Sequence, residues 1–117
     1  MSDNIKRGYE GEQLAADFLV QKGFEVVERN YRHKHSEIDL IVKKGNWLIF
    51  VEVKTRSSYA FGYPEEFVDY KKVKTILEGA DHYIYKNNWQ GNVRYDIVSV
   101  RLNKDTPEIV HLEDAFY

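Results

Sequence analysis

The sequence of 117 residues predicts an α/β fold, in which a mixed central sheet is flanked by helices. Two segments repeat apolar residues at helical spacing, and five others have the alternating or β-branched character of strands. They follow one another as helix, three strands, helix and two strands. Hydrophobic residues make up 43% of the chain, which suffices for a packed core, and the length corresponds to a single domain over residues 1–117.

The first helix is predicted from about Asn4 to Lys22, with Gly23 as its C-terminal cap. Apolar residues at helical spacing form a stripe along one face: Ile5, Tyr9, Ala16, Leu19 and Val20. Leu14 and Phe18 lie on another arc, so this helix is expected to be covered on two sides.

Three strands are expected next, over Phe24–Tyr31, Glu37–Val42 and Trp47–Val53. The sequence Lys44-Gly45-Asn46 is typical of a hairpin turn between the last two of them. Consecutive strands joined by so short a turn pair antiparallel.

The second helix is expected to begin at Pro64, where a missing amide donor costs nothing, and an apolar stripe at helical spacing follows it. Two closing strands, Val93–Leu102 and Glu108–Leu112, complete the order. On the first of these, Asp96 is expected to pair with Arg94 or with a helix.

The hairpin brings two acids together. Apolar residues occupy one face of each of its strands: Ile38, Leu40 and Val42 in the first, and Trp47, Ile49, Val51 and Val53 in the second. Matching these faces pairs Leu40 with either Ile49 or Val51. Either register places Asp39 and Glu52 on the same face, with Cβ atoms about 5 Å apart if directly opposite or about 7 Å if diagonal.

Two such carboxylates repel unless a positive charge lies between them, and Lys54 shares their face. A hard cation such as Mg²⁺ or Mn²⁺ suits this arrangement, because it is held by one or two carboxylates and keeps several waters. Together the three residues are chemically sufficient for metal-assisted phosphodiester hydrolysis. The alternative is an ordinary solvated pair of Glu52 and Lys54, worth under about 1 kcal/mol, although Ile41 and Phe50 on this face disfavour a wet surface.

Glu12 falls in the middle of the apolar stripe of the first helix. An acid aimed at the core is costly unless it is paired with a cation, a backbone donor or a metal. Gly8 and Gly11 lie beside it, where they would let another backbone or a phosphate chain approach closely.

The net charge of −2 excludes a globally basic nucleic-acid binder, but the charge is uneven. Residues 29–56 contain seven basic and three acidic side chains, a net charge of +4, so the rest of the chain carries −6. The basic residues expected to contact phosphates are Arg29, Arg32, Lys34 and Arg56, and in the second helix Lys71 and Lys72. For the two helix lysines, an ordinary solvated face is an equal alternative.

The chain has no cysteine, which excludes disulfides and thiol chemistry. Its longest uninterrupted apolar run, Leu48–Val51, is far too short to cross a membrane, and its polar first residues are unlike a signal peptide. A cytoplasmic protein with no membrane partner is therefore expected.

Several segments, distributed almost from end to end, resemble the YraN-like family of small bacterial proteins: residues 7–12 (RGYEGE), 29–32 (RNYR), 36–41 (SEIDLI), 51–56 (VEVKTR), 94–98 (RYDIV) and 113–116 (EDAF). That family is regarded as part of the restriction-endonuclease-like PD-(D/E)XK superfamily, related in fold to archaeal Holliday junction resolvases. The resemblance implies a core of helix, three strands, helix and strand. One departure is Ser36, where the family usually has glycine.

The resemblance also implies roles for individual residues. Asp39 matches the motif aspartate, Glu52-Val53-Lys54 the E-x-K element, and Glu12 the helix glutamate that often completes the site. Asp39 and Glu52, assisted by the carbonyl of Val53, are then the metal ligands, and Lys54 orients the attacking water.

These features predict a nucleic-acid-binding, Mg²⁺- or Mn²⁺-dependent endonuclease-like enzyme acting on DNA or RNA. The alternatives are a catalytically silent nucleic-acid-binding module in a repair or recombination assembly, and a protein-interaction domain without a nucleic-acid role. A homodimer is left open, since enzymes that cut both strands of a duplex often pair two active sites.

Overall fold

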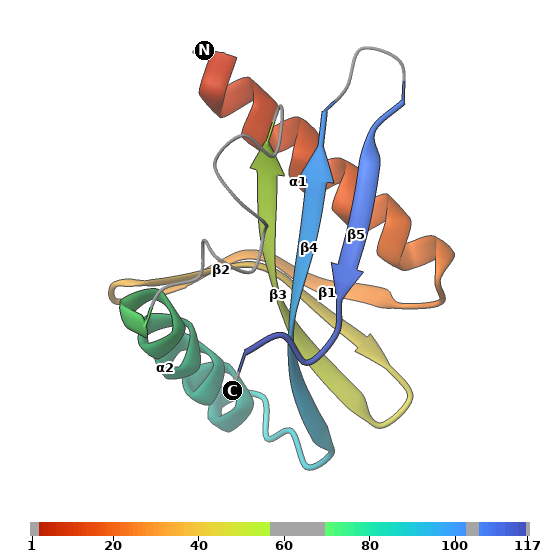
Figure 1. Cartoon of the computed structure of the whole chain (residues 1–117). Helices are drawn as coiled ribbons and strands as arrows, with labels where there is room; N and C mark the ends of the chain where they lie inside the picture. Colours follow the sequence, from red (N-terminus) through yellow and green to blue (C-terminus); the bar gives the residue numbers. More distant parts are fainter. Residues whose placement is uncertain (1–2, 57–69, 103–105, 117) are drawn as a thin grey trace.

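The computed structural model describes residues 3–56, 70–102 and 106–116, with side chains from residue 8 onward. The elements are α1 (Asp3–Gln21), β1 (Glu25–His33), β2 (Ser36–Lys44), β3 (Trp47–Arg56), α2 (Tyr70–Lys86), β4 (Asn92–Arg101) and β5 (Glu108–Leu112). Their order confirms the predicted succession of helix, three strands, helix and two strands (Figure 1).

The five strands form one mixed sheet in the order β1-β2-β3-β4-β5. Neighbouring strands pair antiparallel except β3 and β4, which are parallel and joined through the segment that contains α2. This is the mixed α/β architecture that the sequence predicts, and it is consistent with the restriction-endonuclease-like core that the resemblance implies.

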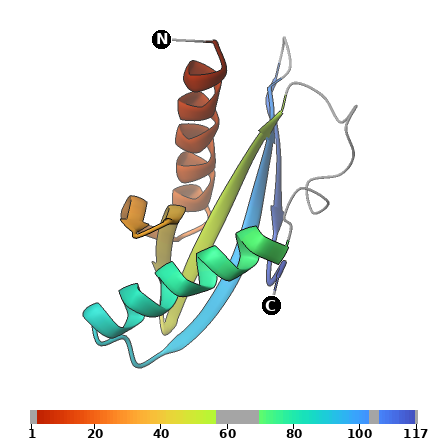
Figure 2. The same cartoon turned by 90° about the vertical axis from the view of Figure 1, so that its left-hand side faces the viewer.

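The two helices pack against opposite faces of the central strands (Figure 2). Because side chains alternate along a strand, Ile49 and Val51 of β3 lie in the cluster under α1, whereas Leu48 and Phe50 lie in the cluster under α2. None of the helices in the described ranges is long and apolar enough to span a membrane.

The predicted boundaries differ from the observed ones by a few residues. Gly23 has a φ of 96° and ends α1 as a left-handed cap, and Gly45 has a φ of 59° in the β2–β3 turn. The predicted helix start at Pro64 lies outside the described residues, where α2 is seen from Tyr70 onward.

The predicted apolar stripe of α1 is wrong at two positions. Tyr9 is 59% exposed and Val20 is 54% exposed, whereas Ala15, Ala16 and Leu19 are buried. Tyr9 lies seven residues before Ala16 and thus on the same side of the helix, but about 10 Å further along its axis. At that level the helix no longer covers the apolar cluster.

The sheet forks after its first two strands. β2 pairs with β3 only from Lys44↔Trp47 to Leu40↔Val51. Past that point β2 stays paired with β1 as far as His33↔Ser36, while β3 stays paired with β4 as far as Arg56↔Arg101. In Figure 1 the β1–β2 hairpin bends away across the other strands.

The fork also corrects the predicted face of Ile38. Simple alternation puts Ile38 with Leu40 and Val42, but it packs in the α2 cluster, while Leu40 and Val42 pack under α1. Once β2 separates from β3, the strand twists freely, so residues two apart no longer face the same helix.

Candidate active site

Asp39 and Glu52 are the first residues beyond the last paired residues at the fork. Of the two registers that the sequence allows, the structure has Leu40 opposite Val51, the register in which Asp39 follows on the side of Glu52 as the strands begin to diverge. Both line a cavity of about 550 Å³, bordered by the N-terminal half of α1 on one side and by Lys72 of α2 on the other. The fork thus lets residues from both faces of the sheet meet.

Asp39 is held in place by the backbone of β3. The amide of Val53 donates a hydrogen bond of 2.8 Å to its Oδ2 atom, so the carboxylate bridges the two diverging strands. Burial, and next the charge of Glu52, raise the pKa of Asp39 to about 8, although the Val53 amide opposes this shift. In the absence of a cation this carboxyl group is therefore mostly protonated at neutral pH.

Glu12 reaches the same cavity from α1. Burial raises its pKa, and hydrogen bonding to the carboxyl group of Asp39 partly offsets the effect. Two carboxyl groups can share a hydrogen bond only if one of them carries a proton, which agrees with the raised pKa of Asp39. The acid that the sequence places in the apolar stripe is thus aimed at the site, because the sheet beneath it has divided.

The two glycines beside Glu12 differ in their surroundings. A Cβ atom on Gly11 would collide with the side chain of Thr55, so the helix backbone lies directly on β3 at this point. Gly8 has no atom within 4 Å of its would-be Cβ and instead borders the cavity. The predicted close approach of another segment therefore holds at Gly11, and the cavity opens at Gly8.

Glu52 is only 4% exposed and has two lysines as counter-ions. Its Oε1 atom lies 3.5 Å from Nζ of Lys54, which is predicted from the sequence, and 3.0 Å from Nζ of Lys72, which comes from α2. Lys72 is expected from the sequence only as a phosphate contact; the structure places it against the acid cluster.

The residues present fit a divalent cation of the Mg²⁺ type. The buried Glu52 and the half-buried Asp39 face one cavity, and burial together with the charge of Glu52 raises the pKa of Asp39, an effect that a bound cation would oppose. Within residues 3–56, 70–102 and 106–116, no group of three histidine, aspartate or glutamate side chains is arranged to hold a metal by itself. A cation would therefore be held by Asp39 and Glu52, with the carbonyl of Val53 and water completing its shell.

The predicted phosphate contacts divide into two groups. Arg32 and Arg56 line the cavity together with Lys72. The remaining three, Arg29, Lys34 and Lys71, are exposed and do not border it: Arg29 donates to the Gln13 side chain, and Lys34 sits in the β1–β2 turn with a φ of 55°. Arg32 also pairs with Glu37 across the hairpin at 3.4 Å.

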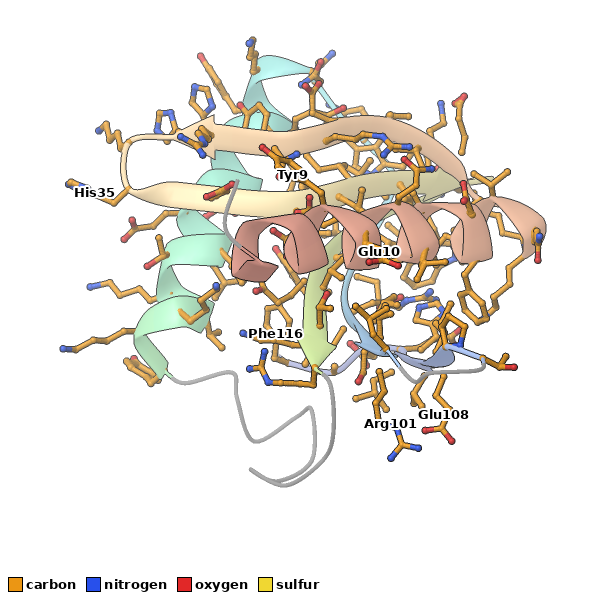
Figure 3. All side chains as sticks on the ribbon, turned by 90° about the horizontal axis from the view of Figure 1, so that it is seen from above. Tyr9, Glu10, His35, Arg101, Glu108 and Phe116 are labelled. Carbon is orange, nitrogen blue, oxygen red and sulfur yellow. The ribbon has the colours of Figure 1, made fainter. Side chains whose placement is uncertain are left out.

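Four further residues line the cavity without having been predicted to: Tyr9, Asn30, Glu37 and Thr55. Figure 3 shows Tyr9 on the edge of α1 toward the β1–β2 hairpin, with Glu10 on the opposite edge. Helical spacing could have indicated Tyr9 as a site residue, because it lies three residues before Glu12 and so neighbours it on the helix surface.

Comparison with known proteins identifies the family of the chain that carries this site. The model described as "Uncharacterised protein family UPF0102" matches residues 11–100, which include Glu12, Asp39, Glu52, Lys54 and Lys72. The chain belongs to the UPF0102 family. The resemblance drawn from the sequence motifs is thereby confirmed.

UPF0102 proteins from distant bacteria are similar to it over almost their whole length. A relative from Christiangramia forsetii is 39% identical over 100% of this chain and 98% of its own. Relatives from Cytophaga hutchinsonii and Clostridioides difficile are 45% and 44% identical over 97% of this chain, and 97% and 99% of their own. Family membership assigns no reaction here, so the function has to be argued from the chemistry of the site.

Proposed function

We propose that this protein is a divalent-metal-dependent phosphodiester hydrolase, an endonuclease-like enzyme that acts on DNA or RNA. The observation that carries the proposal is the convergence of Asp39, Glu52 and Lys54 where β2 and β3 diverge. A buried and a half-buried carboxyl group at one cavity, beside a nearly buried ammonium group, cost folding free energy whenever both are ionised, which is typical of functional sites.

Asp39 and Glu52 would hold Mg²⁺ or Mn²⁺ together with the carbonyl of Val53. A cation bound there supplies Lewis acidity toward a phosphate oxygen and lowers the pKa of a coordinated water. The Val53 amide keeps Asp39 turned toward the cavity, and Glu12 shares the proton of Asp39 until that proton is released.

Lys54 is the residue proposed to position the attacking water. Its side chain is 12% exposed, and its ammonium group is anchored 3.5 Å from Glu52, so it points into the cavity with little freedom. A fixed ammonium beside the phosphate also balances the negative charge that develops as the phosphorus becomes five-coordinate.

The rim of the cavity supports a nucleic-acid substrate. Arg32, Arg56 and Lys72 surround acids that would otherwise repel a polyanion, and the exposed ring of Tyr9 is available for stacking on a base. Because the whole chain has a net charge of −2, attraction has to come from this local group of cations.

The test is a cleavage assay on linear, flapped and four-way DNA and on single-stranded RNA, with Mg²⁺ or Mn²⁺. Asp39→Asn and Glu52→Gln should each lower the rate by at least about 100-fold, because either change removes one of two anionic ligands. Glu10→Gln is the matched control, since Glu10 is an exposed acid on the other edge of α1.

Equal cleavage by the two site variants and the parent would refute the proposal. Salt-sensitive binding that ignores both the metal and the two substitutions, without cleavage, would instead identify a silent binding module. Binding to neither DNA nor RNA at moderate ionic strength would favour a protein-interaction domain.

A further inference from the structure

Two ammonium groups share a single buried carboxylate oxygen in this site. Lys72 Nζ lies 3.0 Å and Lys54 Nζ lies 3.5 Å from Oε1 of Glu52. One cation is enough to neutralise one carboxylate, and here two ammonium groups approach the same oxygen atom.

The two lysines are held very differently. Lys54 belongs to the same strand as Glu52 and its side chain is 12% exposed, whereas Lys72 belongs to α2 and its side chain is 44% exposed. The ammonium group of Lys72 sits on a flexible four-carbon stem, so it can move without any change in the backbone. Lys54 is the fixed member of the pair and Lys72 the movable one.

A second cavity offers the Lys72 ammonium group an alternative position. It borders both the main cavity and a smaller one of about 250 Å³, which is lined by His35, Glu37, Thr75 and Ile76. Glu37 is the other residue common to both cavities, so the two adjoin beside this lysine. A polyanionic strand that leaves the main cavity along this path would pass the Lys72 ammonium group.

On the premise of the proposed function, we infer that Lys72 is an exchangeable counter-ion of Glu52. Its ammonium group neutralises Glu52 when the site holds no metal. A divalent cation between Asp39 and Glu52 repels it, and it then pairs with a phosphate of the bound strand next to the scissile one. Lys72 is thus a positioning residue that lowers metal affinity in the free protein and restores it when nucleic acid binds.

The test measures metal and nucleic-acid binding separately. Mn²⁺ alone is titrated calorimetrically into the parent and into Lys72→Met and Lys72→Gln, each checked for folding by circular dichroism. A 20-nucleotide single-stranded DNA with phosphorothioate linkages, which resist hydrolysis, is titrated in Mn²⁺ and separately in EDTA by fluorescence anisotropy at several salt concentrations. Lys71→Met and Lys74→Met are the matched controls, because both are exposed lysines of the same helix that do not border the main cavity.

Both Lys72 variants should bind Mn²⁺ at least fivefold more tightly than the parent. In Mn²⁺ they should also bind the DNA several-fold more weakly than the parent, with a salt slope smaller by about 0.7. In EDTA, where Lys72 pairs with Glu52, this difference should be smaller. The controls should leave the Mn²⁺ affinity unchanged. Equal or weaker Mn²⁺ binding by both Lys72 variants would overturn the inference.

Asp39→Asn separates this result from failure of the proposed function. If the parent binds Mn²⁺, Asp39→Asn abolishes that binding and the Lys72 variants bind no tighter, only the counter-ion inference fails. If the parent does not bind Mn²⁺, or Asp39→Asn binds it equally well, the metal site fails and the inference fails with it.

Discussion

The half-buried Asp39 and the fully buried Asp96 are two aspartates of the same sheet whose pKa values shift in opposite directions. Asp96 is fully buried and accepts hydrogen bonds from Nε and Nη2 of Arg94, both at 2.9 Å, and from the amide of Asp114 at 3.0 Å. His111 Nε2 also lies 2.7 Å from Oδ2 of Asp96. Burial opposes ionisation of Asp96, but these bonds outweigh it and lower its pKa.

Asp39 meets the same desolvation with far less compensation. Burial, and next the charges of Glu52 and Glu12, outweigh the Val53 amide and Lys72 and raise its pKa to about 8. Burial acts in the same direction on both residues, and the partners decide the outcome. The partners of Asp96 all come from within the chain, and they fasten the C-terminal segment to β4. The partners of Asp39 do not compensate its negative charge, as expected of a group that binds a ligand.

The largest effect should come from replacing Asp96. Asp96→Asn leaves Arg94 and the enclosed His111 without their anion, and breaking such a buried pair costs about 3–5 kcal/mol. The free energy of unfolding in urea measures this loss. Glu108→Gln is the control, because its exposed ion pair with Arg101 should contribute under about 1 kcal/mol. An equal loss in both variants would show that the buried Asp96 network stabilises the fold no more than an exposed ion pair does.

The same substitution at Asp39 should act in the opposite direction. At pH 8 without metal, Asp39→Asn removes a carboxylate that repels Glu52, and it keeps an acceptor for the Val53 amide. We expect a gain of at least about 1 kcal/mol in the free energy of unfolding at pH 8, which shrinks as the pH falls and vanishes only near pH 3.8, where Asp39 is protonated in the folded and the unfolded chain alike. Destabilisation at pH 8 would contradict the comparison.

The pH dependence of the parent should follow the raised pKa of Asp39. Between its ordinary value of 3.8 and about 8, the folded chain keeps a proton that the unfolded chain has lost. Stability contributed by this group is therefore present at low pH and lost as the pH rises to 8, with a slope of up to about 1.4 kcal/mol per pH unit. Urea denaturation of the metal-free parent and of Asp39→Asn from pH 5 to 8 should show this slope only in the parent.

Metal binding should show the corresponding trend. Mn²⁺ requires ionised Asp39, so its affinity for the parent should rise from pH 6 to pH 8. Calorimetric titration at these two values checks this, and an affinity independent of pH would argue that Asp39 is not a ligand.

The smallest effect concerns a neutral polar group. Among the described residues, the Ser36 hydroxyl is buried without a hydrogen-bond partner and faces Gly79 of α2. Ser36→Ala should raise the free energy of unfolding by up to about 1 kcal/mol, because it removes an unpaired hydroxyl at little cost in packing. A measurable loss would indicate that this hydroxyl has a partner, as the Asp96 carboxylate does.

Local features of the molecule were largely predictable from sequence. Helical spacing, the Gly23 cap and the hairpin turn at Gly45 place α1 and the first three strands within a few residues. Pairing of two apolar faces was enough to bring Asp39 and Glu52 together, since both allowed registers do so. Of the two partners expected for Asp96, Arg94 or a helix, the structure has Arg94, two residues away on the same strand.

Features beyond the fork were not predictable, because strand alternation assumes a continuous hairpin. The twist of β2 before Leu40 moves Ile38 to the other cluster, and it leaves Tyr9 exposed beside the cavity rather than above a core. Lys72 comes from a helix whose position over the sheet depends on tertiary packing. No local pattern therefore signals its contact with Glu52.

The absence of a side chain at Gly11 has a consequence for how this family can vary. Contact between the α1 backbone and Thr55 fixes the distance between helix and strand one residue before Glu12. Alanine at this position would lift the amino-terminal half of the helix and carry the third acid away from the other two. Tolerance of residue 11 to substitution therefore measures how strictly the chemistry depends on that separation.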